Sequence, residues 1–176
     1  MRNIRPSSVA FVAVLACAAS LLPSSHAGAE TPQPAGREPS SIAKAICRPK
    51  AANLIHDVVG EAARISTPTW RNHLYSCDYR YAGGTMVLSV KELSSWSQTY
   101  RYFDGLGRSM HKTIPILQLG QGAFRVRDGS IVVRKDWKVL LVNVAGLPRQ
   151  FGNPATSVEG VALSVAGVIL DCWHGD

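Results

Sequence analysis

Four cysteines, at positions 17, 47, 77 and 172, carry the most definite chemistry in this sequence. Cys47 lies at the end of the first predicted helix, and Cys77 lies in the middle of the first predicted strand. Outside the cytoplasm, thiols that lie close together in the fold are oxidised. We therefore predict a disulfide between them, closing a loop of about 30 residues. Cys172 is left over on the apolar face of the last predicted helix. The simplest interpretation is a buried free thiol, and the alternative is a reactive or intermolecular one.

A second set of side chains, the arginines of a predicted β-hairpin, could bind anions. Asp128-Gly129 is typical of a two-residue hairpin turn. In that register Arg125, Arg127 and Arg134 share one solvent-facing side of the sheet. Such a surface would attract an anionic envelope polymer, a lipid head group or an acidic partner. The alternative is a sheet face that these arginines merely keep soluble.

Motifs for known catalytic chemistry are weak. Ser41-Ile42-Ala43-Lys44 matches S-x-x-K but lacks the S-D-N and K-T-G partners of penicillin-interacting serine enzymes, so it indicates a helix start. Gly120-Gln121-Gly122 precedes a predicted strand rather than a helix, so its amides are not arranged to cradle a phosphate. The five histidines show no metal-ligand spacing. We predict no catalytic residue, no metal and no cofactor.

The first 29 residues resemble a cleavable secretory signal. A basic start is followed by an apolar stretch at 9–22, and Ala27-x-Ala29 is the small-residue pattern that a signal peptidase cuts after. The apolar run of about 14 residues is shorter than the roughly 20 that a membrane-spanning helix needs. We predict a mature chain that begins at Glu30 and is secreted or held in the cell envelope.

An alternative processing site lies inside the apolar run. Val14-Leu15-Ala16-Cys17 resembles the lipobox of bacterial lipoproteins, in which the cysteine is lipid-modified. Lipidation of Cys17 is the one route by which we predict attachment to a membrane. Ordinary cleavage is favoured because the apolar stretch continues past Cys17.

Composition favours one small, mildly basic domain. The chain has 176 residues, is 46% hydrophobic and carries a formal net charge of +7. Removing Arg2 and Arg5 with the signal leaves 17 basic and 12 acidic residues, a net charge of +5. A nucleic-acid binder concentrates its charge in longer Lys/Arg runs than Arg134-Lys135. We therefore predict no nucleic-acid partner.

The chain divides into the signal, a tether at 30–40 and a domain at 41–176. The tether holds three prolines and no large apolar residue, which predicts flexibility. Periodicity and turn residues then predict an α+β fold: an antiparallel sheet made of a hairpin and a meander, with about three helices packed on one side. The predicted helices cover 41–47, 49–59, 95–106 and 156–172, and the predicted strands cover 74–81, 86–91, 123–127, 130–134 and 139–142.

Several of these segments together resemble a family of small exported actinobacterial proteins, many of them lipoproteins, known only as a domain of unknown function. The resemblance covers about residues 40–173. It is carried by Cys47 with Val58-Val59-Gly60, by Cys77-Asp78-Tyr79, by LGQGAF at 119–124 and by IVVRKDWKVLLV at 131–142. It implies a Cys47–Cys77 disulfide and a fold similar to the extracellular sensor domains of some bacterial kinases. It implies no catalytic residues.

These observations favour an exported, non-catalytic binding or sensor-like module of the cell envelope or extracellular space. Its partner would be an envelope ligand or protein, an anionic one if the arginine face binds it. The alternative is a small secreted enzyme or enzyme inhibitor acting on cell-wall material, which would need a cleft lined by titratable groups.

Overall fold

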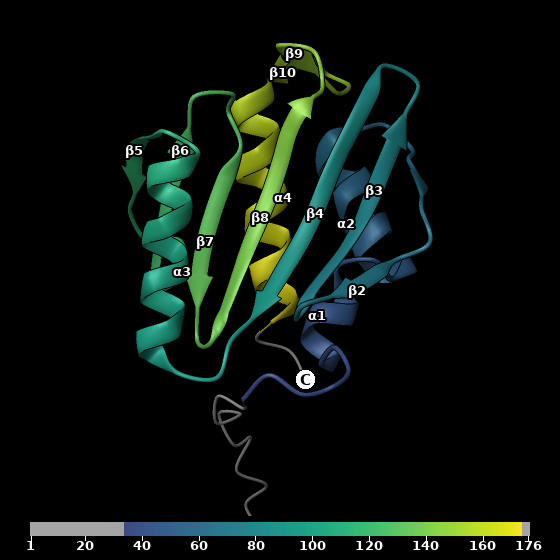
Figure 1. The fold of residues 1–176 in the computed structure, drawn as a ribbon. Helices are drawn as coiled ribbons and strands as arrows, with labels where there is room; N and C mark the ends of the chain where they lie inside the picture. Colours follow the sequence, from purple (N-terminus) through teal and green to yellow (C-terminus); the bar gives the residue numbers. More distant parts are fainter. Residues whose placement is uncertain (1–33, 174–176) are drawn as a thin grey trace, which may run out of the picture. The chain divides into compact units, whose positions relative to one another are not determined.

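The fold is that of a computed structural model, which describes residues 34–173. The predicted signal, its cleavage site at Ala29 and the alternative lipidation site at Cys17 lie outside the described residues. An antiparallel sheet of eight strands dominates the described part, in the order β1-β3-β4-β8-β7-β6-β5, with β2 paired to β3 (Figure 1). A separate two-stranded sheet pairs β9 with β10. The strands are β1 (Arg64–Ile65), β2 (Thr69–Arg71), β3 (Leu74–Tyr81), β4 (Gly84–Glu92), β5 (Lys112–Ile116), β6 (Gly122–Val126), β7 (Ile131–Lys135), β8 (Lys138–Gly146), β9 (Gln150–Phe151) and β10 (Thr156–Ser157).

The described residues also form four helices, and each begins at a serine cap or at a proline. They are α1 (Ser41–Ala45), α2 (Pro49–Val59), α3 (Trp96–Ser109) and α4 (Val158–Cys172). The side chain of Ser95 accepts a hydrogen bond from the amide of Gln98, and that of Ser157 accepts one from the amide of Gly160. These bonds satisfy amides that the first helical turn leaves unpaired. The predicted α+β class is confirmed.

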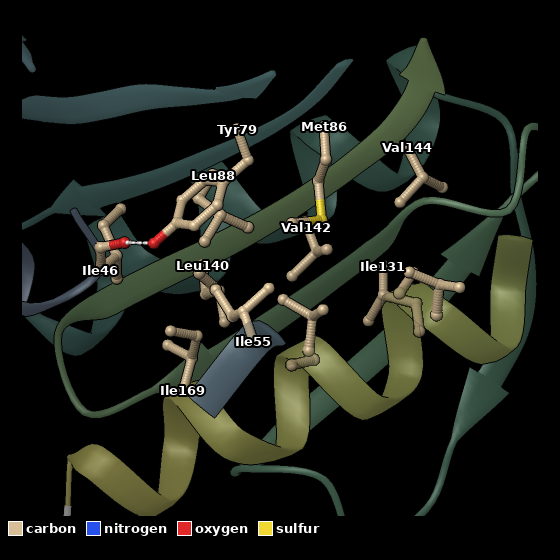
Figure 2. Packing of buried hydrophobic residues seen from close by; sticks show 14 of the residues in the cluster. Ile46, Ile55, Tyr79, Met86, Leu88, Ile131, Leu140, Val142, Val144 and Ile169 are labelled. Carbon is tan, nitrogen blue, oxygen red and sulfur yellow. Dashed lines mark hydrogen bonds between the residues drawn. The ribbon is translucent and has the colours of Figure 1, made fainter. Parts of the chain in front are cut away.

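The sheet is covered on both faces. On β7, Ile131 and Val133 point into the main core, where α1, α2 and α4 pack, whereas Val132 points to the other face. There it meets Phe124 and Phe103, the latter on α3. Three helices therefore pack on one side, whereas α3 packs on the opposite side, which corrects the prediction that the helices share one side (Figure 1). Figure 2 shows the main core between the central strands and α4.

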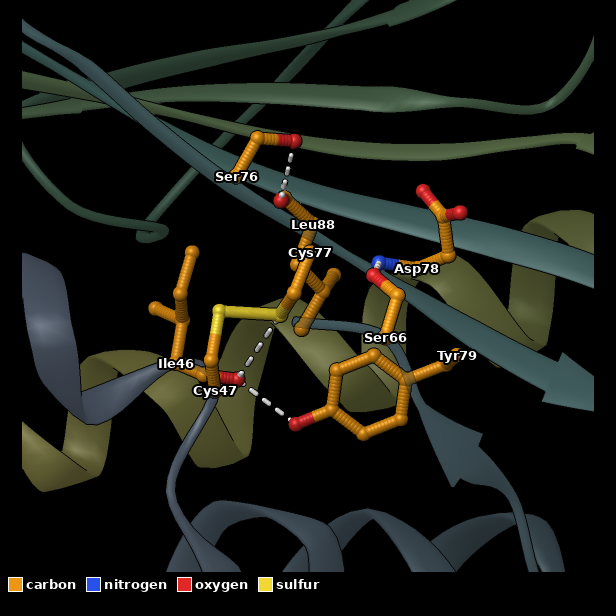
Figure 3. The surroundings of a disulfide bond; sticks show 8 residues. All are labelled: Ile46, Cys47, Ser66, Ser76, Cys77, Asp78, Tyr79 and Leu88. Carbon is orange, nitrogen blue, oxygen red and sulfur yellow. Dashed lines mark hydrogen bonds between the residues drawn. A yellow bond between two sulfur atoms is a disulfide. The ribbon is translucent and has the colours of Figure 1, made fainter. Parts of the chain in front are cut away.

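The predicted disulfide is present. Cys47 and Cys77 are bonded, with their Cα atoms 6.1 Å apart, which ties the segment after α1 to the middle of β3 (Figure 3). Beside it, the hydroxyl of Tyr79 donates a 2.6 Å hydrogen bond to the backbone carbonyl of Ile46. Cys77 and Tyr79 are both buried in the main core. A covalent bond and a buried hydrogen bond thus hold the same helix end against the sheet.

The segment before α1 is bonded to the domain, unlike the flexible tether that we predicted through residue 40. The amide of Ala35 donates to the carbonyl of Leu93 at 3.2 Å, and the indole of Trp70 donates to the carbonyl of Arg37 at 2.8 Å. The hydroxyl and the amide of Ser40 donate to the buried carboxylate of Glu92. Residues 35–40 are therefore hydrogen-bonded to the domain. The segment has no large apolar side chain, so its composition did not indicate these contacts. They are made by backbone groups and polar side chains instead.

Because Tyr79 and Tyr81 are buried, we predict that the protein loses stability at alkaline pH. Burial raises the pKa of Tyr79 and of Tyr81 well above the ordinary value of 10.0, with smaller contributions from Tyr81 and Glu61 respectively. The folded protein therefore resists ionisation more than the unfolded chain does, so stability is full below about pH 10 and falls above it. One such phenol contributes about 1.4 kcal/mol per pH unit in that window. In urea unfolding at about pH 9 to 11, the Tyr79→Phe variant should show a shallower decline, and an unchanged slope would contradict this assignment.

Candidate functional site

The arginines that we predicted on one sheet face do not lie together. In the β6–β7 hairpin, Arg125 pairs with Ile131 and Gly122 pairs with Arg134. This register is one residue away from the predicted one, so Arg125 and Arg134 point to opposite faces of the sheet. Arg127 is exposed in the turn itself. The prediction of a shared cationic face is therefore wrong.

The turn explains the different register. It has three residues rather than two, because the amide of Val126 donates to the carbonyl of Ser130 and Arg127, Asp128 and Gly129 lie between them. Gly129 has a φ of 91°, a value that favours glycine, and Asp128 accepts a hydrogen bond from the amide of Ser130. A three-residue hairpin turn that ends in such a residue is the next most common type after two-residue turns.

Arg134 is buried against α3 instead of standing in solvent. Its side chain is 6% exposed, and its guanidinium lies 4.1 Å from the ring centroid of Tyr100 and 5.5 Å from that of Trp96. The ring of Phe103 lies 5.8 Å away, and the carbonyl of Gln121 accepts a hydrogen bond from the guanidinium. Cation–π contacts of a desolvated arginine are stabilising. Arg134 therefore fastens α3 to the sheet.

The Arg134→Ala substitution should lower the free energy of unfolding by about 2–4 kcal/mol, because it removes the cation–π contacts and a partly buried hydrogen bond. Arg101→Ala is the matched control, since Arg101 is an exposed residue of α3 whose removal should cost no more than about 0.5 kcal/mol. Urea unfolding followed by tryptophan fluorescence measures both. Equal effects of the two substitutions would mean that Arg134 does not fasten α3.

A groove lies between the edge strand β5 and the N-terminal half of α4, with a volume of about 210 Å³. Its lining is mostly apolar. Ile131, which is 1% exposed, belongs both to this lining and to the main core, whereas Ile114 and Leu163 are 49% and 45% exposed. The lining residues are Ile114, Ile116, Arg125, Ile131, Ser157, Glu159, Gly160 and Leu163.

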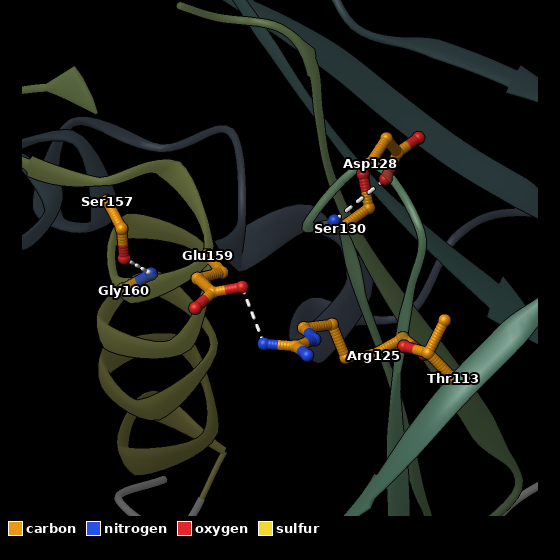
Figure 4. Close-up of polar contacts among 7 residues, drawn as sticks. All are labelled: Thr113, Arg125, Asp128, Ser130, Ser157, Glu159 and Gly160. Carbon is orange, nitrogen blue, oxygen red and sulfur yellow. Dashed lines mark hydrogen bonds and ion pairs between the residues drawn. The ribbon is translucent and has the colours of Figure 1, made fainter. Parts of the chain in front are cut away.

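One ion pair crosses the groove. A guanidinium nitrogen of Arg125, on β6, donates to the carboxylate of Glu159, on α4, at 2.5 Å (Figure 4). The two side chains are 29% and 49% exposed. Such a pair contributes little to stability at a solvated position. It does place a positive and a negative group beside an apolar surface, an arrangement that can orient a bound group with a polar end.

Local features of the chain keep the two sides of the groove in place. The β6–β7 turn packs against the start of α4, since a Cβ atom at Gly129 would lie 3.1 Å from a methyl carbon of Val158. A Cβ atom at Gly160 would lie 3.2 Å from the hydroxyl of Ser157, which caps the helix. A side chain at Gly160 would crowd that capping hydroxyl, so glycine suits this part of the lining.

The edge strand limits how a partner can bind here. Lys112, Thr113, Ile114 and Pro115 are all exposed on β5, which pairs only with β6 in the described sheet. Proline has no backbone N–H, and natural proteins use it to protect edge strands from pairing with another chain. Side chains, rather than an added strand, are therefore the favoured way for a ligand to contact this edge.

Sequence reasoning missed this groove. Lys112–Ile116 was not predicted as a strand, because Pro115 interrupts it and it shows no clear alternation. The remaining walls come from strands and a helix that are distant in the sequence. One feature of the sequence could have indicated the strand. Ile114 and Ile116 flank Pro115, and proline occurs within edge strands but not within central ones.

Residues 34–173 contain no candidate metal site. No group of three or more histidine, cysteine, aspartate or glutamate side chains there could hold a metal ion. No helix in that range has the length and apolar character needed to cross a membrane. Cys172 is a free thiol, as predicted, but it is partly rather than fully buried.

Comparison with known proteins gives no family assignment. The chain matches no protein-family model, no curated protein and no solved structure.

Proposed function

We propose that this protein is an exported, non-catalytic binding module of the cell envelope or extracellular space, and that the groove between β5 and α4 holds the apolar part of its ligand or partner. The observation that carries the proposal is the groove's composition. Ile114, Ile116 and Leu163 leave apolar surface open to solvent beside the Arg125–Glu159 ion pair. Ligand sites are mostly apolar surfaces with a few placed polar groups.

The compartment is supported by the disulfide and by the sequence before the domain. A bond between Cys47 and Cys77 persists in an oxidising environment. The basic start, the apolar stretch and the Ala27-x-Ala29 pattern are typical of a signal peptide. Both observations support export.

Methyl-resolved NMR of the disulfide-bonded protein tests this proposal. Octanoate, octanol and octylammonium serve as probes because each has eight carbons and an apolar chain, and their head groups are anionic, neutral and cationic respectively. The methyl signals of Ile114, Ile116 and Leu163 should shift together and saturably. The Leu163→Asp variant should lose this response, because a carboxylate replaces an apolar wall of the groove.

Val58→Asp is the matched control, since Val58 is 41% exposed on α2 and does not line the groove. It should keep the response. Saturable shifts confined to methyl groups outside the groove, or no saturable shift with any of the three probes, would contradict the proposal.

A further inference from the structure

The size of the groove indicates what it holds. Its volume of about 210 Å³ is below the range of roughly 300–1,000 Å³ that is usual for pockets enclosing drug-sized ligands. One or two large side chains would fill it, whereas most of a larger small molecule would remain outside. The occupant is therefore small, or it is the inserted part of something larger.

The rim of the groove indicates that the occupant extends beyond it. Ile114 and Leu163 are each about half exposed, so apolar surface continues outward on both sides. A pocket that takes one anchoring side chain, surrounded by contacts that exclude water, is the usual centre of a protein–protein interface. The β5 edge carries Pro115, so the partner contributes side chains here rather than a paired strand.

Arg125 is the cationic residue of the groove lining, and its unused donors can contact an acidic partner. One nitrogen of Arg125 donates to Glu159, but a guanidinium has five donors, and this side chain is 29% exposed. It can therefore bind a second carboxylate at the same time. Arg127 is exposed in the turn that packs against the start of α4, but Asp128 beside it is exposed too, so the turn adds no net charge. Arg149, which precedes β9, is exposed as well.

We infer that the groove recognises a segment of a partner polypeptide in which a large apolar side chain lies next to an acidic one. The apolar side chain fills the groove against Ile131 and Leu163, and the carboxylate pairs with Arg125. This inference rests on the proposed function, because it names the partner class for the same groove.

Selection from a random peptide library displayed on phage tests the inference. The disulfide-bonded protein is the target, and enriched sequences are synthesised and their dissociation constants measured. Enriched peptides should carry a leucine, isoleucine or phenylalanine next to an aspartate or glutamate. The Leu163→Asp variant should weaken their binding at least about tenfold, and Val58→Asp should leave it unchanged.

A double-mutant cycle tests the charge pairing. Arg125→Gln should weaken binding about tenfold, and replacing the acidic residue of the peptide by its amide should weaken it equally. The two changes together should cost no more than either alone. The proton NMR spectrum of each variant shows whether it is folded.

Three outcomes would overturn the inference: no enriched peptide, enriched peptides without an acidic residue, or peptides that bind the wild-type and Leu163→Asp proteins equally. The amphiphile titrations separate this failure from that of the proposed function. If octanoate shifts the groove methyls while no peptide depends on Leu163, the groove binds small amphiphiles and only the polypeptide inference fails. If neither probe depends on Leu163, both proposals fail.

Discussion

Replacing Cys47 and Cys77 together by alanine should lower the free energy of unfolding by about 3–4 kcal/mol, because the bond closes a loop of 30 residues in the unfolded chain. The loop holds α2 and the first two strands, so the whole segment gains conformational freedom when the bond is lost. Urea unfolding of the double variant and of the oxidised wild-type protein measures the difference.

Cys172→Ala is the matched control for this prediction. Cys172 is free and partly buried at the end of α4, so its replacement should change the free energy of unfolding by less than about 1 kcal/mol. A comparable loss in both variants would contradict the assignment. So would a peptide map under non-reducing conditions that joins Cys47 or Cys77 to Cys172.

The second large effect concerns Ile131, which belongs both to the groove and to the main core. Ile131→Ala should lower the free energy of unfolding by about 2–5 kcal/mol, because the side chain is 1% exposed and its loss leaves a cavity between β7 and α4. The same substitution should deepen the groove, so the variant should bind larger apolar groups than the wild type does.

Ile114→Ala separates these two roles. Ile114 lines the same groove but is 49% exposed, so its removal should cost no more than about 1 kcal/mol while still weakening binding. Urea unfolding and the amphiphile titrations, run on both variants, measure the two effects. A similar loss of stability in the two variants would contradict the assignment of Ile131 as the buried base of the groove.

Strong alternation made the β3–β4 hairpin predictable from the sequence. Tyr75, Cys77 and Tyr79 alternate with polar residues, so only one register buries the apolar set. In the structure Cys77 pairs with Leu88 and Tyr79 pairs with Met86, all in the main core. The disulfide was predicted on other grounds, namely the oxidising compartment and the family resemblance.

The β6–β7 hairpin could not be predicted in the same way. Ile131, Val132 and Val133 are all buried, because helices cover both faces of the sheet at this point. A strand that is apolar on both faces fits a two-residue or a three-residue turn equally well, and Asp128-Gly129 is compatible with either. The turn geometry therefore decides the register, and with it the positions of the arginines.

The apolar middle of β8 also lacks alternation. This pattern indicates that helices cover both faces of the sheet, although we predicted them on one side. Residues 139–142 are all apolar, a pattern that favours a strand covered on both faces, and in the structure Val139 belongs to the core under α3 while Leu140 belongs to the main core. Coverage on both faces requires a helix on each side of the sheet. The position of α3 opposite α4 was thus implied by the central strand.

The groove could not be predicted from the sequence, because its walls come from distant segments that meet only after folding. Ile116 and Leu163 come from the edge strand and from the last helix, and nothing in their local sequence indicates that they share a surface. Arg125, which we predicted on an anion-binding face with Arg127 and Arg134, lies in the groove lining with other neighbours. Its partner is Glu159 of α4 rather than the other arginines.

Photo-cross-linking in the native host tests most directly whether the groove is the binding surface. The protein is produced with a diazirine analogue of leucine in place of leucine, and cross-linked residues are mapped by mass spectrometry. Leu163 lines the groove and is 45% exposed, whereas Leu117 is 84% exposed and lies outside the lining. Random encounters would favour Leu117 because it is the more exposed of the two. Our account predicts cross-links to the partner at Leu163. Cross-links at Leu117 without any at Leu163 would contradict it.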